Sequence, residues 1–281
     1  GDARAWLEPA LASIDLVVVV GGDGAARQVA SVIAGRAVHL WISPAGTENL
    51  LARALGMERS GAALVRAIQA KRATAIDLGW ARPAGGADAN FLLMASCGFD
   101  ADVVARLTAS RRGAISHASY LRPILGALWS WRSPTVRLEI DGEQTIAVGG
   151  AIVANGPRYA FGIDPVRAAR FDDGMLSAAL LPSRGGAGAL ALGAGCVMGF
   201  RPRPRACERL RVICDRPVHW QLDGDSAPWG VADTVEFGLR RRAVRILLPA
   251  PRVPGQFESS LLEVLVRPAV EWSLAPFDEE V

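Results

Sequence analysis

The first third of the chain alternates apolar runs with glycine turns and helical spacing. The run 16–20 is wholly apolar, as in a parallel strand that is buried on both faces. A glycine turn follows this run, and 25–33 then has the spacing of a helix. We predict a second strand at 38–42 and further helices at 49–55 and 62–70. Strand, glycine turn, helix and strand in this order form an α/β unit with a right-handed crossover.

From residue 75 onwards, short runs of apolar residues, several of them alternating with polar ones, predict a β-rich region. In 136–140 the apolar residues fall on one face, and Asp141-Gly142 supplies a hairpin turn. The other predicted strands are 91–95, 145–153, 175–181, 210–214, 219–222 and 235–237.

One helix is predicted to interrupt this β-rich region. Its apolar stripe fits a helix that faces the core, with Pro123 perturbing it near its start. A helix in contact with lipid, with Trp129 and Trp131 at an interface, is the alternative. The stripe runs through Ile115, Ala118, Leu121, Leu125, Leu128 and Trp131.

The change of pattern near residue 76 predicts two domains, as does the length of 281 residues. We expect 1–76 to form an α/β nucleotide-binding domain, joined by 246–281. We expect 77–245 to form a β-rich substrate and metal domain. Residues 261–266 fit a strand or a helix equally well, and 278–280 are expected to fray. A chain that is 51% hydrophobic and 21% charged can bury a sizeable core.

Charge and cysteine content exclude several classes of protein. The net charge is only +3, and all basic residues except Lys71 are arginines, which does not establish nucleic-acid binding. Four scattered cysteines without a CxxC pair exclude a disulfide scaffold and a zinc ribbon, and fit a reduced, cytoplasmic protein. The uncharged stretch 185–200 is shorter than the ~20 residues of a membrane span. No secretory signal opens the chain. Because the first residue is Gly1 and not methionine, we expect the natural start of the sequence to lie upstream.

Arginines gather in two places in the C-terminal half. A solvated surface explains both clusters, and a patch that faces anionic lipid headgroups or nucleotide phosphates is the alternative. The clusters are Arg201, Arg203, Arg205, Arg209 and Arg211, and then Arg240, Arg241, Arg242 and Arg245.

The sequence Gly21-Gly22-Asp23-Gly24 follows the first predicted strand and opens a helix. Glycine lets the backbone approach a ligand, and the N–H groups at a helix start favour an anion. A carboxylate beside a phosphate is repulsive unless a cation or a hydroxyl lies between them. Asp23 therefore indicates Mg²⁺ bridging or contact with a substrate hydroxyl, and a plain β-turn is the alternative.

A second loop, 44–49, follows the second strand and also precedes a helix. Because ligands bind at the carboxyl ends of strands in open α/β sheets, we expect both loops on one rim. Thr47 is expected either to donate its hydroxyl to a phosphate or to cap the helix, and Glu48 and Asn49 have the same two possibilities.

These loops resemble the catalytic region of the diacylglycerol kinase family. This family includes bacterial lipid kinases, sphingosine kinases and ceramide kinases, and is related to NAD kinases. The first resembling segments are GGDG after VVVV and PAGTENLLARALG, and the resemblance covers roughly 14–250. Further down the chain they are IDLGW at 76–80, SCGFDADV at 96–103, VANGPRYAFG at 153–162, ARFDDGMLSAALL at 169–181 and WQLDGD at 220–225.

The resemblance implies a two-domain kinase with ATP and Mg²⁺ at the domain cleft. It implies that Asp225 is the proton acceptor for the lipid hydroxyl, with Asp223 beside it and Asp23 also in the catalytic set. Asp173, with main-chain oxygens near Arg170 and Met175, matches a Mg²⁺ site to which Asp77 is linked through water. The nucleotide site would comprise Gly21, Gly22, Asp23, Gly24, Ala25, Ala26, Arg27, Gln28, Gly46, Thr47, Glu48 and Asn49.

Taken without the family, the same residues have simpler explanations. Asp223-Gly224-Asp225 fits a hairpin turn, as we predict for 141–143, and Asp172-Asp173-Gly174 is typical of a turn. The cysteines and histidines have no partner spacing and are expected to serve packing or to lie on the surface.

Four departures from the family pattern bear on activity. The family begins with a further strand and an Asn-Pro-x-x-Gly phosphate loop, whereas only twenty residues precede Gly21, so we expect an incomplete ATP site and an open sheet edge in this sequence. Ala25 replaces the usual threonine. Leu50 replaces a frequent aspartate, for which Glu48 is a candidate substitute. Asp225 stands where glutamate is usual, so its carboxylate is one methylene shorter.

We therefore predict an ATP-dependent lipid kinase that phosphorylates a hydroxyl of diacylglycerol, a sphingoid base or a related lipid. The alternatives are a catalytically weak lipid- or nucleotide-binding module of the same fold and an NAD kinase. A lipid substrate implies peripheral contact with a membrane. We expect no nucleic-acid partner, and self-association into a homo-oligomer is left open.

Overall fold

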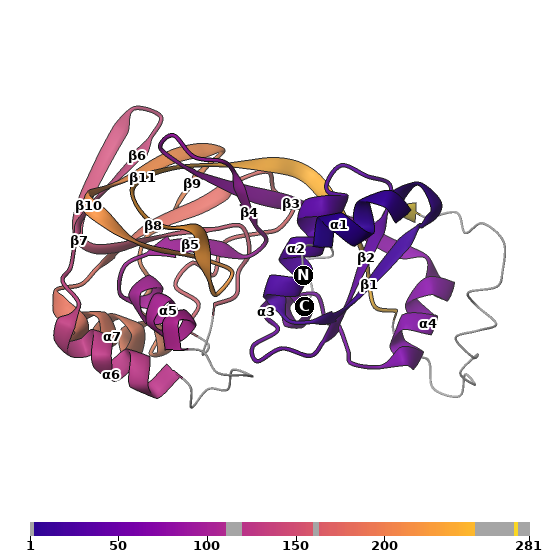
Figure 1. The fold of residues 1–281 in the computed structure, drawn as a ribbon, viewed down its shortest axis with the longest axis horizontal. Helices are drawn as coiled ribbons and strands as arrows, with labels where there is room; N and C mark the ends of the chain where they lie inside the picture. Colours follow the sequence, from indigo (N-terminus) through magenta and orange to yellow (C-terminus); the bar gives the residue numbers. More distant parts are fainter. Residues whose placement is uncertain (1–2, 111–119, 160–162, 251–272, 275–281) are drawn as a thin grey trace. The chain divides into compact units, whose positions relative to one another are not determined.

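The structure, a computed structural model, describes residues 3–110, 120–159, 163–250 and 273–274. The chain forms two compact units, one built from Gly1–Asp77 and Arg241–Val281 and the other from Leu78–Arg240. Strands β3 (Arg72–Pro83) and β11 (Asp225–Leu247) each have residues in both units (Figure 1). The sequence predictions for 251–272 and 275–281, including the ambiguous 261–266, lie outside the described residues.

The first unit contains the predicted parallel strands. β1 (Leu16–Gly21) pairs in parallel with β2 (His39–Pro44), which pairs in parallel with the end of β11. The apolar sequence of β1 predicted burial on both faces of the strand, and this prediction was wrong. Helix α2 packs against the strand, and on β1 Val18 and Val20 remain 42% and 68% exposed.

The predicted helices of this unit are present, with ends shifted by one or two residues. On α2, buried residues recur at the spacing of one helical face, at Ala26, Val29, Ala30 and Ile33. Short β12 (Ser273–Leu274) pairs in parallel with β3. The helices are α1 (Ala3–Leu7), a 3₁₀ helix (Glu8–Ser13), α2 (Asp23–Ile33), α3 (Leu50–Ala54) and α4 (Gly61–Ala70).

The second unit is antiparallel, and its central strand is β10 (Arg209–Leu222). One edge of β10 pairs with β11, and the other edge pairs with β6 (Thr135–Ile140) and β5 (Met94–Cys97), which lie end to end. β7 (Glu143–Ala154) pairs with both β6 and β5 on their far side. β8 (Leu176–Pro182), β9 (Arg205–Cys207) and, beside β3, β4 (Ala89–Phe91) complete the sheet.

Two strand predictions were wrong in detail. The segment 91–95 is not one strand, because Leu92 and Leu93 form a bend that separates β4 from β5. Conversely, 210–214 and 219–222 belong to one strand, β10, whose register with β11 shifts between Ile213 and Val218. The interruption of the alternating pattern between 214 and 219 therefore corresponds to an irregular register within one strand, and not to the end of a strand.

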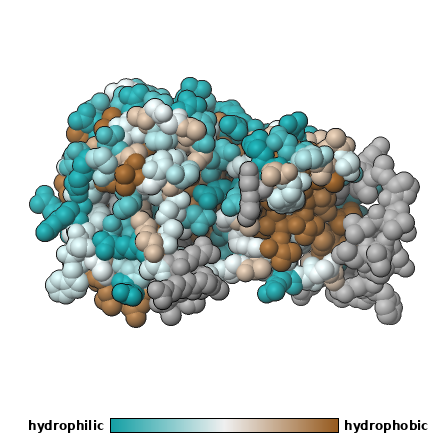
Figure 2. All heavy atoms as spheres, in the orientation of Figure 1, coloured by the Kyte–Doolittle hydropathy of each residue, from teal (hydrophilic) through white to brown (hydrophobic). Residues whose placement is uncertain are grey.

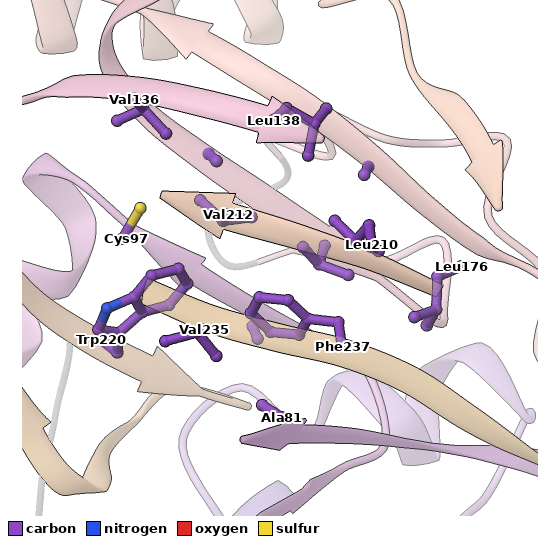
Figure 3. Packing of buried hydrophobic residues seen from close by; sticks show 14 of the residues in the cluster. Ala81, Cys97, Val136, Leu138, Leu176, Leu210, Val212, Trp220, Val235 and Phe237 are labelled. Carbon is purple, nitrogen blue, oxygen red and sulfur yellow. The ribbon is translucent and has the colours of Figure 1, made fainter. Parts of the chain in front are cut away.

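The core of the second unit lies on one face of this sheet (Figure 3). Trp220 and Phe237 from β10 and β11 pack with ring centroids 5.6 Å apart, and the Trp220 indole N–H donates to the carbonyl of Ala232. The sulfur atoms of Cys97 and Cys214 lie 3.9 Å apart in this core. All four cysteines are buried and free, so packing, one of the two roles predicted for them, is the one that the structure supports.

Three described helices, and not one, interrupt the β-rich region. α5 (Phe99–Ser110) packs on β10, α6 (Leu121–Ser130) packs on α5, and α7 (Gly185–Val197) packs on α6 (Figure 1). Within the described residues, no helix is long and apolar enough to cross a membrane.

The prediction that the apolar stripe of the helix faces the core was wrong. Leu121 and Leu125 are exposed, whereas Pro123 and Ala127 of α6 are buried. The reason is that α5 occupies the face of the sheet, so that α6 lies in a second layer. Trp131 is buried just after the helix, where its ring packs edge-on against Phe99. Ile115 and Ala118 lie outside the described residues.

Candidate functional site

The loops that follow β1 and β2 meet through their glycines. The N–H of Ala45 donates to the carbonyl of Gly21 at 2.9 Å. A Cβ atom added to Gly46 would lie 2.6 Å from the Cα of Gly22, and one added to Gly22 would lie 3.1 Å from the Cα of Gly46. The prediction that both loops share one rim is confirmed, and the contact is backbone against backbone because neither residue has a side chain.

Helix α2 presents its amino terminus at this rim. Gly22 is the N-cap residue and has extended backbone without a side-chain cap. The helix begins at Asp23, two residues earlier than predicted, so that the N–H groups of Gly24 and Ala25 belong to its first turn. Ala25 and Gln28 are exposed, whereas the side chain of Ala26 is fully buried. The arrangement is chemically suited to an anion.

The carboxylate of Asp23 caps α3. Its Oδ2 accepts the N–H of Leu50 and its Oδ1 accepts the N–H of Leu51, both at 2.9 Å. Burial raises the pKa of Asp23 above its usual value, and the N–H groups of Leu51 and Leu50 act against this shift. The resemblance predicted an aspartate at position 50, where this chain has leucine. The hydrogen bond to Asp23 involves the main-chain N–H of Leu50, so it does not depend on the side chain at this position.

The second loop is closed by Asn49. Its side-chain oxygen accepts the N–H of Gly46 and its amide donates to the Gly46 carbonyl, both at 2.7 Å. Asn49 adopts a left-handed backbone and does not cap α3 with its side chain. Thr47 is exposed, and Glu48 lies 3.8 Å from Arg53. Asp23, and not Asn49, thus accepts the first two N–H groups of α3.

In the second unit, Asp223 and Gly224 form the tight turn between β10 and β11. Both have positive φ, as do Asp141 and Gly142 in the hairpin of β6 and β7. The turn interpretation of both segments is therefore confirmed. It does not exclude a further role for Asp225, which lies opposite Leu222 in the hairpin and is half-buried.

Asp223 is buried and accepts three main-chain hydrogen bonds. The N–H groups of Leu92 and Leu93 donate to its carboxylate at 2.8 Å and that of Met94 at 3.0 Å. Its own N–H donates to the carbonyl of Met94. The side chain thus holds the break between β4 and β5 against the hairpin that carries Asp225.

A chain of polar side chains lies behind this hairpin. The N–H of Gly224 donates to Gln221 at 2.7 Å, the Gln221 amide donates to Ser96 at 2.6 Å, and Ser96 donates to Asp100. The Tyr159 hydroxyl also donates to Asp100, at 2.6 Å. Burial, and secondarily the Asp100 carboxylate, raises the pKa of Tyr159 well above its usual range.

Sequence reasoning missed these four side chains, although a signal was present. Gln221 lies in WQLDGD, Ser96 and Asp100 lie in SCGFDADV, and Tyr159 lies in VANGPRYAFG. Three segments that resemble the family are therefore joined by one hydrogen-bonded chain.

The residues predicted to hold a metal are placed as follows. Asp173 is exposed in a turn, where its Oδ1 accepts the N–H of Met175 at 3.0 Å, and Arg170 lies 3.5 Å from Asp172. Asp77 is fully buried in β3 and accepts the N–H of Arg242 at 2.6 Å. Over the described part of the chain, no group of three or more His, Cys, Asp or Glu residues converges on a point. One carboxylate with main-chain oxygens is still a donor set of the hard-oxygen type that Mg²⁺ prefers.

The sequence matches two families of domains in succession. Residues 1–81 match the diacylglycerol kinase catalytic domain. Residues 94–191 match the C-terminal β-sandwich-like domain of YegS, which is described as resembling that of NAD kinase. These two matches place the chain in a class of lipid kinases. Similar proteins identify a narrower group within this class.

Over most of its length the chain is similar to proteins named YegS-like lipid kinases. It is 32% identical over 264 residues to a probable lipid kinase, YegS-like, of Pseudomonas aeruginosa strain UCBPP-PA14, covering 89% of this chain and 82% of the relative. A diacylglycerol kinase of Mycobacterium tuberculosis strain H37Rv is 32% identical over 163 residues, covering 57% of this chain and 52% of that protein. The chain belongs to the diacylglycerol kinase family of lipid kinases, and is thus a transferase.

Solved structures show the same two-part fold. A diacylglycerol kinase structure from Bacillus anthracis strain Sterne aligns with a TM-score of 0.62 at 17% identity, over 88% of this chain and 81% of that one. Yeast NADH kinase complexed with NADH aligns with a TM-score of 0.51 at 12% identity, over 84% and 63%. At these identities the likeness concerns the fold, an α/β part followed by a β-rich domain.

Proposed function

We propose that this protein transfers the γ-phosphoryl group of ATP to a hydroxyl group of a lipid such as diacylglycerol or a sphingoid base. Membership of a lipid kinase family supports the lipid acceptor. The observation that carries the nucleotide site is the contact of Gly22 with Gly46 beside the amino terminus of α2. This contact brings the second loop, which carries Thr47, beside the main-chain N–H groups at the start of α2, and neither glycine adds a side chain there.

The nucleotide phosphates would lie against residues 21–28 and 46–49. Main-chain donors at the start of α2 would hold them, assisted by the hydroxyl of Thr47. Ala26 contributes its main chain only, because its side chain is buried. A site of this kind needs few cationic side chains, in agreement with a chain that has a single lysine.

Asp225 is proposed to receive the proton of the lipid hydroxyl. As the hydroxyl oxygen bonds to the γ-phosphorus, the bond from that phosphorus to the β–γ bridging oxygen breaks, giving a phosphate monoester and ADP. The proton passes to the Asp225 carboxylate. Asp223 would position the hairpin and not touch the substrate, because three main-chain N–H groups already engage its carboxylate.

Mg²⁺ is proposed as the metal, held by the Asp173 carboxylate and the main-chain oxygens of Arg170 and Met175. When bound, it would offset the negative charge of the phosphates. Asp77 is proposed to act on this ion through water. The catalytic contribution of Asp23 is proposed to be indirect, through the two loops that it joins.

The test is phosphate transfer from labelled ATP, with Mg²⁺, to a panel of lipids in mixed micelles and to NAD in parallel. Asp225→Asn is the active-site variant. Glu143→Gln is the matched control, because Glu143 follows the Asp141-Gly142 turn as Asp225 follows the Asp223-Gly224 turn. We expect transfer to a lipid, unchanged by Glu143→Gln and abolished by Asp225→Asn.

Other results would contradict the proposal in distinct ways. Preferential phosphorylation of NAD would favour a dinucleotide kinase. Full activity of Asp225→Asn would refute the assignment of the proton acceptor. Absence of transfer by a protein shown to be folded would favour a binding module. Peripheral contact with the membrane is part of the proposal, because the acceptor is a lipid.

A further inference from the structure

Helix α7 of the second unit is apolar on every side and yet is not buried. Its thirteen residues are glycine, alanine, leucine, cysteine and valine. A helix without a polar face is normally enclosed by protein or by lipid. On α7 only Gly186 and Cys196 are buried, whereas Leu190 and Val197 are exposed and Met198, directly after the helix, is 83% exposed. Exposure of this apolar surface to water is therefore energetically unfavourable.

Helix α6 adds a second exposed apolar stripe. Leu121, Leu125 and Trp129 recur every four residues, and Trp129 is 89% exposed. The two helices pack closely, since a Cβ atom on Gly186 would lie 2.5 Å from the Cα of Leu128. Figure 2 shows hydrophobic side chains at the end of the unit where Figure 1 draws α6. The α6/α7 surface is defined by Leu121, Leu125, Trp129, Leu190, Val197, Met198 and Phe200.

The two sequence segments that carry this surface contain charges of one sign only. Residues 103–138, which include α6, contain six arginines and no Asp or Glu, and residues 174–207, which include α7, contain four arginines and no Asp or Glu. Arg122, Arg132, Arg184 and Arg203 are exposed, and none forms an ion pair with another described residue. These cations are available to an external anion.

Charge also distinguishes between possible occupants. A second copy of the chain, joined by two-fold symmetry through this surface, would bring like arginine clusters together. An anionic bilayer satisfies both features at once, because acyl chains cover the apolar stripes and lipid phosphates neutralise the arginines.

We propose that α6 and α7 dock this protein on a bilayer that contains anionic phospholipid. Trp129, Leu125 and Val197 enter the boundary between headgroups and acyl chains, and Arg122, Arg184 and Arg203 contact lipid phosphates. The inference rests on the proposed function, in which the acceptor is a membrane lipid, and it adds the surface and the charge preference of that contact.

Vesicle sedimentation tests the docking surface. The full chain is mixed with vesicles of phosphatidylcholine alone or of phosphatidylcholine with phosphatidylglycerol. We expect binding to the anionic vesicles that weakens with salt. Arg122→Gln/Arg184→Gln/Arg203→Gln should lower partitioning by roughly 100-fold, and Leu125→Gln/Trp129→Gln/Val197→Gln by roughly tenfold or more.

Two matched variants control for charge and hydrophobicity. Arg4→Gln/Arg36→Gln/Arg59→Gln removes the same number of exposed arginines from the first unit, and Trp6→Gln/Val231→Gln removes exposed apolar side chains elsewhere. Both should bind as the unmodified protein does. Equal binding by the α6/α7 variants, or no preference for anionic vesicles, would overturn the proposal.

Activity on a short-chain diacylglycerol dissolved as monomers separates this proposal from the proposed function. The α6/α7 variants should phosphorylate it at the unmodified rate while losing vesicle binding. Vesicle binding through α6 and α7 by a protein without kinase activity would refute only the proposed function. Sedimentation velocity completes the test by measuring the oligomeric state. If the unmodified protein forms a dimer that the apolar substitutions dissociate, and if it does not bind vesicles, lipid docking is refuted.

Discussion

The carboxylate of Asp23 holds the main chain of Leu50, 27 residues further along the sequence, by a hydrogen bond of 2.9 Å. Its second oxygen holds Leu51 in the same way. The first residue of α2 thus caps α3, whose N-cap residue Asn49 forms no side-chain cap of its own. Because both loops belong to the proposed nucleotide site, this side chain has a structural role whatever its role in catalysis.

Removal of the Asp23 carboxylate should destabilise the first unit. Asp23→Ala leaves two N–H groups of α3 without their acceptor, so the free energy of unfolding should fall by about 1–2 kcal/mol. Urea unfolding measures this change, and Glu48→Gln in the neighbouring loop is the control, with a change below about 0.5 kcal/mol. Equal stability of Asp23→Ala and the unmodified protein would show that the cap is dispensable.

Gly46→Ala should separate the two loops. The added Cβ would lie 2.6 Å from the Cα of Gly22, and because this contact atom belongs to the main chain, one of the two backbones must move. A displacement of ~1 Å at a reacting site costs on the order of 100-fold in rate. We expect a loss of that order in kcat/KM for ATP. Gly61→Ala, whose Cβ would meet nothing within 4 Å, should keep full activity.

Asp223 and Asp225 should respond differently to the same substitution. Asp223→Asn replaces an acceptor of three buried N–H groups by a side chain with one acceptor atom, and should lower the free energy of unfolding by about 3 kcal/mol. Asp225→Asn should change stability by less than about 0.5 kcal/mol while abolishing transfer. Thermal unfolding and the kinase assay, run on both variants, distinguish a structural from a catalytic aspartate. The converse pattern would reverse the two assignments.

The buried His39 predicts a pH dependence of stability. Burial lowers its pKa below the usual 6.5, so the unfolded chain binds more protons than the folded protein in the window just below pH 6.5. Stability that is present at neutral pH should therefore decline as the pH falls through 6.5. His39→Gln should flatten this part of the profile of Tm against pH. His219→Gln, at an exposed position, should leave it unchanged.

Local pattern predicted β1, β2 and helices α2 to α4 of the first unit, for a physical reason, although it missed α1, the 3₁₀ helix and β3. The apolar run of β1, the glycines after it and the helical spacing of α2 are features of neighbouring residues, and parallel pairing with β2 then places both loops on one rim. The exposure of Val18 and Val20 was not predictable in this way. It depends on which element covers each face of the sheet, and an apolar run carries no information on that.

The candidate site divides along the same line. The sequence by itself determined the glycine loops, the DG hairpins and the order of the segments that resemble the family. Tertiary structure decided what each aspartate does, since the partners of Asp223 at Leu93 and of Asp23 at Leu50 are 130 and 27 residues away. It also decided that α6 packs on α5 and exposes Trp129, because helical spacing defines an apolar face and only packing determines what that face meets.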